Sequence, residues 1–118
     1  MRKELSILIF MLDLETGVKD VKAKRDAGET FLLLDVREGW EIETARLEGT
    51  LDIPMGEIPA RAHLELDPEI EIVVMCHHGV RSLNVAVWLR NQGFELAQSM
   101  AGGIEQWSRE IDAKVPRY

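Results

Sequence analysis

Residues 72–90 read IVVMCHHGVRSLNVAVWLR. The stretch begins with an apolar, β-branched run, Ile72 to Met75, which is typical of a buried strand. Cys76 to Arg81 break that pattern, and from Ser82 onward apolar residues recur at helical spacing. The sequence therefore predicts a strand, a short loop and a helix over 82–91, with Cys76 at the point where the strand ends.

The position of Cys76 suits a reactive thiol. A thiol becomes nucleophilic when it loses its proton, and the positive end of a helix favours the thiolate. Gly79 allows the backbone to turn successive N–H groups inward as an anion cradle, and Arg81 adds a positive charge nearby. A free cysteine is also commonly a small buried hydrophobic residue, so the placement of Cys76 by itself leaves both interpretations open.

Composition limits the class of protein. The chain has 118 residues, 46% hydrophobic and 30% charged, which predicts a single globular domain over residues 1–118. Its formal net charge of -7 disfavours nucleic acid and anionic membranes as partners. The single cysteine cannot form an internal disulfide. It fits a reducing compartment, so we expect a cytoplasmic protein.

Apolar segments alternate with helical ones along the chain. We predict strands at 5–14, 31–34, 72–75 and 96–100, an extended segment at 50–53, helices at 18–27, 40–46, 58–66, 82–91 and 104–111, and a polar tail at 114–118. The apolar run near the N-terminus lacks a cleavage pattern and is too short to span a bilayer, so residues 1–10 are interpreted as a strand or an extension rather than a signal.

This alternation predicts an α/β fold, with a mostly parallel sheet and helices on both faces. Ligands of such sheets bind outside the carboxyl ends of the strands. Cys76 should lie at that edge, together with Asp35 and Arg37 at the end of another strand.

Several segments, in their order and spacing, resemble a single-domain rhodanese of the sulfurtransferase superfamily. The resemblance covers roughly residues 12–110, and its segments are LLDVRE at 33–38, LEGTLDIP at 47–54, CHHGVRS at 76–82 and AGGI at 101–104 with Trp107. It implies a rhodanese-like α/β fold with a central, mostly parallel five-stranded sheet. One departure is Ala45-Arg46-Leu47, where the family commonly carries Gly-His and an aliphatic residue.

The resemblance implies a thiosulfate sulfurtransferase. Cys76 matches the catalytic cysteine, and the rest of the loop would bind the substrate: His77, His78, Gly79, Val80 and Arg81. The Cys76 thiolate would take the outer sulfur of a small anionic donor such as thiosulfate. The resulting persulfide would pass it to cyanide or a thiol, and a protein sulfur acceptor is a further expected partner. We expect no metal and no cofactor, because the histidines and Cys76 lack metal-ligand spacing.

Two alternatives stay open. A non-catalytic rhodanese-like module would bind a partner or relay sulfur without turnover. A cysteine-dependent phosphatase or arsenate reductase also places a cysteine in a strand-to-helix loop, but such loops hold one residue more than the four that separate Cys76 from Arg81. A smaller ring of amides suits a sulfur atom better than a tetrahedral phosphate.

The sequence also predicts how neighbouring side chains lie. Because His77 and His78 are adjacent, we expect their rings to diverge. Asp35 and Arg37 are expected to form a structural ion pair, since buried charges come paired. Trp40, Trp88 and Trp107 are expected to pack in the core.

Overall fold

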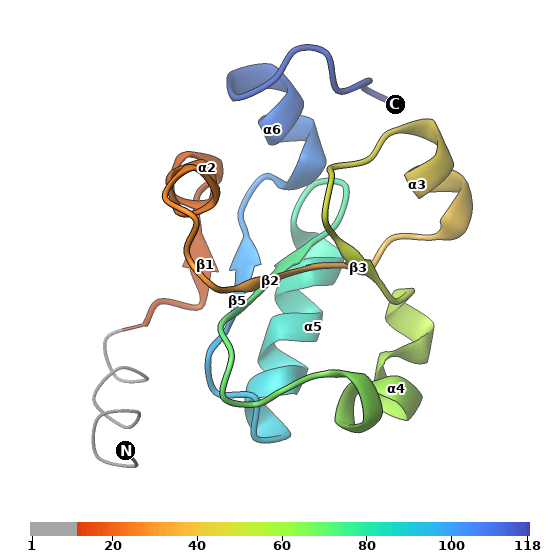
Figure 1. Cartoon of the computed structure of the whole chain (residues 1–118). Helices are drawn as coiled ribbons and strands as arrows, with labels where there is room; N and C mark the ends of the chain where they lie inside the picture. Colours follow the sequence, from red (N-terminus) through yellow and green to blue (C-terminus); the bar gives the residue numbers. More distant parts are fainter. Residues whose placement is uncertain (1–11) are drawn as a thin grey trace.

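The computed structural model describes residues 12–118 (Figure 1). Within them, five strands form one parallel sheet in the order β1-β5-β4-β2-β3. The strands are β1 (Glu15–Thr16), β2 (Leu32–Asp35), β3 (Leu51–Asp52), β4 (Ile72–Met75) and β5 (Ala97–Met100). The helices are α2 (Val18–Asp26), α3 (Gly39–Thr44), α4 (Ile58–Glu65), α5 (Val80–Asn91) and α6 (Gly103–Glu110), with a 3₁₀ turn η1 (Met55–Glu57) before α4. The predicted α/β fold is confirmed.

The central strand β4 is buried on both faces. Ile72 and Val74 pack in one apolar cluster with residues of α4 and α5, whereas Val73 and Met75 pack in a second cluster with residues of α2 and α6. Successive side chains of a strand point to opposite faces, so each face of the sheet has its own helices. This explains why β4 is apolar throughout, and why its predicted bounds match the structure.

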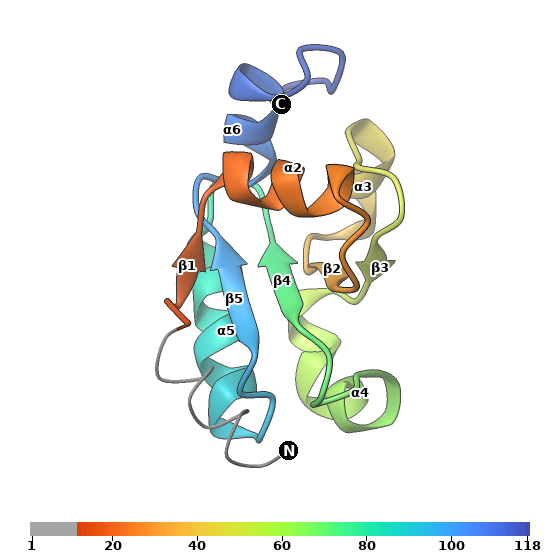
Figure 2. The same cartoon turned by 60° about the vertical axis from the view of Figure 1, so that its left-hand side comes forward.

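The carboxyl ends of the strands meet at one edge of the sheet. Figure 2 shows the arrowheads of β1, β5 and β4 pointing the same way, towards α6. The N–H of Val36 donates to the carbonyl oxygen of Met75 at 3.1 Å, which joins the chain just after β2 to the end of β4. The residues that follow β2 and β4 therefore lie beside one another, as predicted.

The ends of several predicted elements differ from the structure by one or two residues, and the clearest differences lie near the chain start and at the Cys76 loop. The strand predicted at 5–14 falls mostly outside the described residues, and within them the first strand is β1. Helix α5 begins at Val80 rather than Ser82, because Gly79 adopts a φ of 106° and takes the N-cap position. Arg81 and Ser82 consequently belong to the first turn of α5, where backbone N–H groups have no partner within the helix.

Two expectations about side chains are wrong. Trp107 is buried, but Trp40 is 63% exposed on α3. The predicted polar tail is also folded back, since Val115 is buried and its carbonyl oxygen accepts a hydrogen bond from the hydroxyl of Ser108. The fold-back brings Tyr118 to α3, edge-on to Trp40 with the ring centroids 6.0 Å apart.

The N-terminus of α6 holds the loop that follows β4. The N–H of Ile104 donates to the carbonyl oxygen of Cys76 at 3.0 Å, and the N–H of Glu105 donates to that of His77 at 3.1 Å. This close approach requires a glycine at the start of α6. A Cβ on Gly103 would lie 2.3 Å from the His77 carbonyl oxygen, and its φ of 60° is left-handed.

We predict that Gly103→Ala lowers the free energy of unfolding by about 3 kcal/mol, because it adds a steric clash to left-handed strain. Urea denaturation measures the loss. Gly28→Ala is the matched control, since Gly28 has a φ of 67° and no atom lies within 4 Å of where its added methyl group would stand. It should cost only about 1 kcal/mol. Equal losses in the two variants would contradict the role given to the close contact.

Candidate active site

The sulfur of Cys76 lies inside a turn of backbone N–H groups. Cys76 is 1% exposed and follows β4 directly. Its Sγ accepts hydrogen bonds from the N–H of Gly79 at 3.1 Å and from the N–H of Ser82 at 3.3 Å. The loop therefore directs two donors and the positive end of α5 towards one sulfur atom, an arrangement that stabilises negative charge there.

Two buried hydroxyl groups form a hydrogen-bonded chain that begins at this sulfur. The Sγ of Cys76 lies 3.4 Å from the Oγ of Ser82, which lies 2.8 Å from the Oγ of Ser99. Both serines are fully buried. Sequence reasoning places Ser82 in the family motif without assigning it to the site, and it misses Ser99, which comes from β5.

The charge of Arg81 is balanced by Glu41. The guanidinium donates from Nη1 to Oε2 at 2.7 Å and from Nη2 to Oε1 at 2.8 Å. This bidentate bond, opposed by burial and helped by the N–H of Glu38, lowers the pKa of Glu41 from 4.5 to about 2. It also raises the pKa of Arg81. The guanidinium is thus a paired group, a feature that the sequence does not reveal.

Tyr118 joins this ion pair to a second one. Its hydroxyl donates to Oε1 of Glu41 at 3.0 Å and accepts from Nη1 of Arg37 at 3.0 Å. Arg37 pairs with Asp35 at 2.7 Å, and both side chains are fully buried. The structural ion pair predicted between Asp35 and Arg37 is confirmed. Tyr118 thus links the Asp35–Arg37 pair to the Glu41–Arg81 pair.

The two histidine rings do not diverge. His77 and His78 stack with centroids 3.9 Å apart, and the ring of Tyr118 stacks on His77 at 3.9 Å with an interplanar angle of 11°. The prediction of diverging rings is wrong because Tyr118 packs against this side of the loop. Burial, and then the neighbouring His78, lower the pKa of His77, so its ring is neutral near pH 7. Within residues 12–118, its buried Nε2 has no hydrogen-bond partner.

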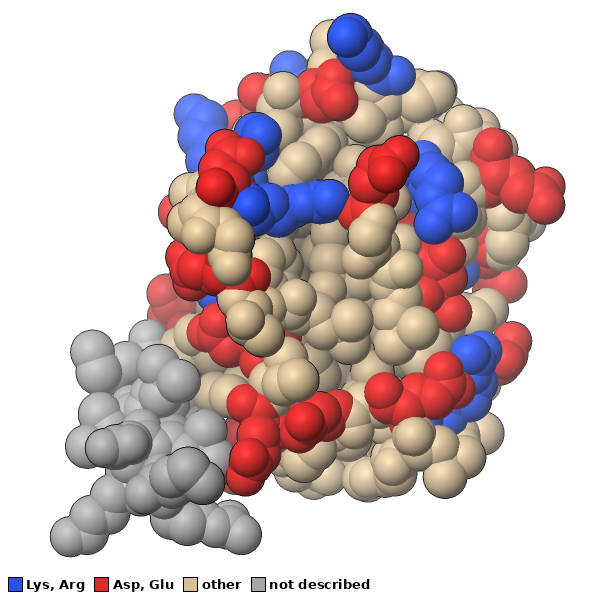
Figure 3. Space-filling model, viewed as in Figure 1, with Lys and Arg blue, Asp and Glu red and all other residues tan. Residues whose placement is uncertain are grey.

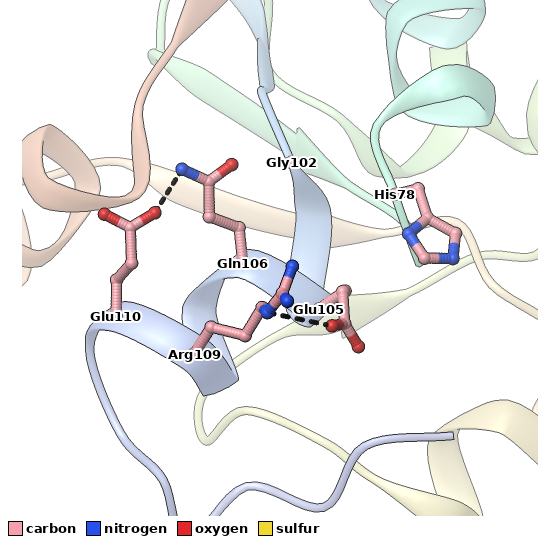
Figure 4. A pocket seen from close by; sticks show the side chains of 6 residues that line it. All are labelled: His78, Gly102, Glu105, Gln106, Arg109 and Glu110. Atoms are coloured by element: carbon pink, nitrogen blue, oxygen red, sulfur yellow. Dashed lines mark hydrogen bonds and ion pairs between the residues drawn. The ribbon is translucent and has the colours of Figure 1, made fainter.

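The outer residues of the loop face solvent. Val80 is 70% exposed, and His78 is exposed. His78 lines a pocket of about 480 Å³ with residues of α6 (Figure 4). In this pocket Glu105 pairs with Arg109, and Gln106 donates to Glu110. The pocket thus adjoins the loop and contains both signs of charge.

Charge is mixed over the visible surface. On the face of the described residues that Figure 3 shows, Lys and Arg side chains lie among Asp and Glu. Within residues 12–118, no helix has the length and apolar character needed to cross a bilayer.

Comparison with known proteins gives the family. The model of the rhodanese-like domain matches residues 17–110. The chain belongs to the rhodanese-like domain family. The match includes the Cys76 loop and the helices on either side of the sheet, so the predicted resemblance is confirmed.

Relatives of this rhodanese-like chain carry names from sulfur chemistry. It is 37% identical over 98 residues to the putative sulfur carrier protein YrkF of Bacillus subtilis, covering 83% of this chain and 52% of YrkF. The chain thus spans about half the length of YrkF. It is also 35% identical over 100 residues to the putative sulfurtransferase YtwF of the same organism, covering 85% of this chain and 95% of YtwF. Both of these relatives are thus named for the handling of sulfur.

Solved structures agree with the rhodanese-like fold. The human single-domain sulfurtransferase TSTD1 superimposes with a TM-score of 0.73 at 23% identity, covering 84% of this chain and 98% of that one. A rhodanese-like domain protein from Staphylococcus aureus gives a TM-score of 0.77 at 23% identity, covering 90% and 99%. At this level of identity, the comparison supports the fold alone.

We predict that Glu41→Gln makes the free energy of unfolding depend less on pH between about pH 4.5 and pH 2. A lowered carboxyl pKa stabilises the fold fully above the unfolded value of 4.5, and this contribution is lost as pH falls through about 2. Glu41→Gln should lower the free energy of unfolding by about 2 kcal/mol at pH 7 and by much less at pH 2. Urea denaturation between these pH values measures both.

The matched control is Glu65→Gln, because Glu65 also pairs with an arginine, Arg61, but is 33% exposed. An exposed pair one helical turn apart is screened by water and contributes little, so Glu65→Gln should change the free energy of unfolding only slightly at either pH. If the free energy of unfolding of Glu41→Gln fell as steeply towards pH 2 as that of the wild type, the stabilising role given to the Glu41–Arg81 pair would be contradicted.

Proposed function

We propose that this chain is a rhodanese-type sulfurtransferase in which Cys76 carries the transferred sulfur. The observation that supports this most directly is the pair of backbone N–H groups, from Gly79 and Ser82, that point at the Sγ of Cys76. They lie in the loop that matches the family, at the carboxyl edge of the sheet. Donors that already face the reacting atom need no rearrangement when negative charge arrives.

The first step loads sulfur onto Cys76. The thiolate attacks the outer sulfur of thiosulfate, an S–S bond forms on Cys76, and the S–S bond of the donor breaks with its electron pair leaving on sulfite. In the second step, cyanide or a thiol attacks the terminal sulfur of the persulfide, and the Cys76 thiolate leaves. No oxidant is needed, because the sulfane sulfur moves between nucleophiles.

The residues of the loop have different roles in this mechanism. The amides of Gly79 and Ser82 hold the negative charge of the thiolate and then of the persulfide. Because Cys76 is 1% exposed, the donor must bring a small terminal sulfur into the loop, which favours a small donor such as thiosulfate. His77, His78 and Val80 form the outer wall of the loop, and Arg81 anchors it through Glu41.

The pairing of Arg81 disfavours the phosphatase alternative. Both terminal nitrogens of Arg81 donate to the carboxylate of Glu41. A transferred phosphoryl group would have to compete with that carboxylate for the arginine, whereas the transferred sulfane sulfur is a single atom that the amides of Gly79 and Ser82 can hold. The short loop and the paired arginine therefore favour sulfur.

A relay module is the second candidate, because YrkF is named as a putative sulfur carrier. In that role, Cys76 would accept sulfur from a protein and deliver it to another protein without turnover on free thiosulfate. Either role needs a reduced thiol, which supports a cytoplasmic location.

We predict that incubation of the full chain with thiosulfate adds the mass of one sulfur atom, measured by mass spectrometry of the intact protein. Cys76→Ser should show no added mass, because the chain has no second cysteine. Cyanide should remove the sulfur from the loaded protein and release thiocyanate.

A characterised rhodanese, loaded under the same conditions, is the positive control. An unmodified wild-type chain beside a loaded control would overturn the proposed thiosulfate activity. A chain that loads from a protein persulfide but not from thiosulfate would instead support the relay module.

A further inference from the structure

The three groups Cys76 Sγ, Ser82 Oγ and Ser99 Oγ form a line with two contacts. The first contact is 3.4 Å and the second is 2.8 Å. Among the described residues, neither hydroxyl has a further side-chain or backbone partner within hydrogen-bond distance. All three residues are at most 1% exposed, so the line ends inside the protein.

The number of protons in these three groups indicates which form of Cys76, the thiol or the thiolate, fits the two contacts. A neutral thiol and two hydroxyls hold three protons, but the line has only two contacts in which a proton can be shared. One buried donor is then left without an acceptor, which is costly. When Cys76 has lost its proton to solvent, two hydroxyl protons serve two contacts: Ser99 donates to Ser82, and Ser82 donates to the thiolate.

We propose that Ser99 is a positioning residue that acts through Ser82 to stabilise the Cys76 thiolate. The bond that Ser99 donates turns the Ser82 hydroxyl towards sulfur and polarises it, and aligned hydroxyls strengthen one another. The hydroxyls keep their own protons and only rotate. This inference rests on the proposed function, since it concerns the thiolate that attacks the sulfur donor.

The fold fixes Ser99 in place. Its N–H donates to the carbonyl oxygen of Leu14 at 2.8 Å, and it pairs in register with Val74 of β4 on its other side. Ser82 is held in the first turn of α5. Both hydroxyls are therefore oriented by backbone that is already ordered, which is the condition for electrostatic preorganisation.

The test is a titration of the thiolate by its ultraviolet absorbance in the full chain. The signal reports Cys76 alone, because the chain has one cysteine, and Cys76→Ser supplies the baseline. We expect the midpoint to move to higher pH by about 1 pH unit in Ser82→Ala and by about half a unit in Ser99→Ala. The double variant should match Ser82→Ala, because Ser99 acts only through Ser82.

Ser108→Ala is the matched control. Ser108 is also a buried serine, but its hydroxyl donates to the carbonyl oxygen of Val115, remote from Cys76 in the hydrogen-bond network. It should lower stability and leave the midpoint unchanged. Urea denaturation of every variant separates a loss of fold from a shift of the thiolate.

Equal midpoints in Ser99→Ala and the wild type would overturn the inference. So would shifts that add in the double variant, because they would show independent routes to the sulfur. Thiosulfate loading of the wild type is measured in parallel. If the wild type loads sulfur but Ser99→Ala does not move the midpoint, this inference alone is wrong. If Ser99→Ala moves the midpoint but the wild type does not load sulfur from thiosulfate, the proposed function alone is wrong.

Discussion

The site depends on a loop whose amides point inward and whose carbonyl groups must therefore find donors outside it. The N-terminus of α6 supplies them, through the N–H groups of Ile104 and Glu105. These are groups that a helix cannot satisfy within itself, so each element meets a need of the other. Glycine at position 103 makes the approach possible, because the carbonyl oxygen of His77 occupies the space that a Cβ would take. The Cys76 loop and the last helix thus form one structural unit.

The groups that face the Sγ of Cys76 are dipoles rather than a free cation. The chain is acidic overall, and the nearest arginine in the loop, Arg81, is paired with Glu41. Backbone N–H groups and the Ser82 hydroxyl carry no net charge, so they would stabilise a thiolate through dipoles alone. In a site built for phosphate, an available arginine would be expected to contact the transferred group. The burial of Cys76 strengthens these dipoles, because water does not screen them.

The sequence predicts what depends on neighbours along the chain. The bounds of β4 follow from its apolar run, and the loop from Cys76 to Arg81 follows from its position between a strand and a helix. The contacts that complete the site could not be predicted, because they join residues that are far apart in the sequence. Glu41 and Arg81 are separated by 40 positions, and Arg37 and Tyr118 by 81. The predicted start of α5 is two residues late because only the backbone angle of Gly79 reveals it. Trp40 shows that a tryptophan on a short helix need not face the core.

The same distant contacts explain why the carboxyl edge of the sheet can hold a buried polar cluster. Asp35 and Arg37 are fully buried as a pair, and removing two charges from water is costly unless each finds further hydrogen bonds. Arg37 finds them in the carbonyl oxygens of Glu41 and Ala45 and in the hydroxyl of Tyr118. That hydroxyl then donates to Glu41 and so reaches the residue that holds Arg81. Tyr118 therefore contacts the Cys76 loop by two routes, one through the ion pairs and one through its ring, which stacks on His77. The folded-back tail belongs to the support of the site as much as the strands do.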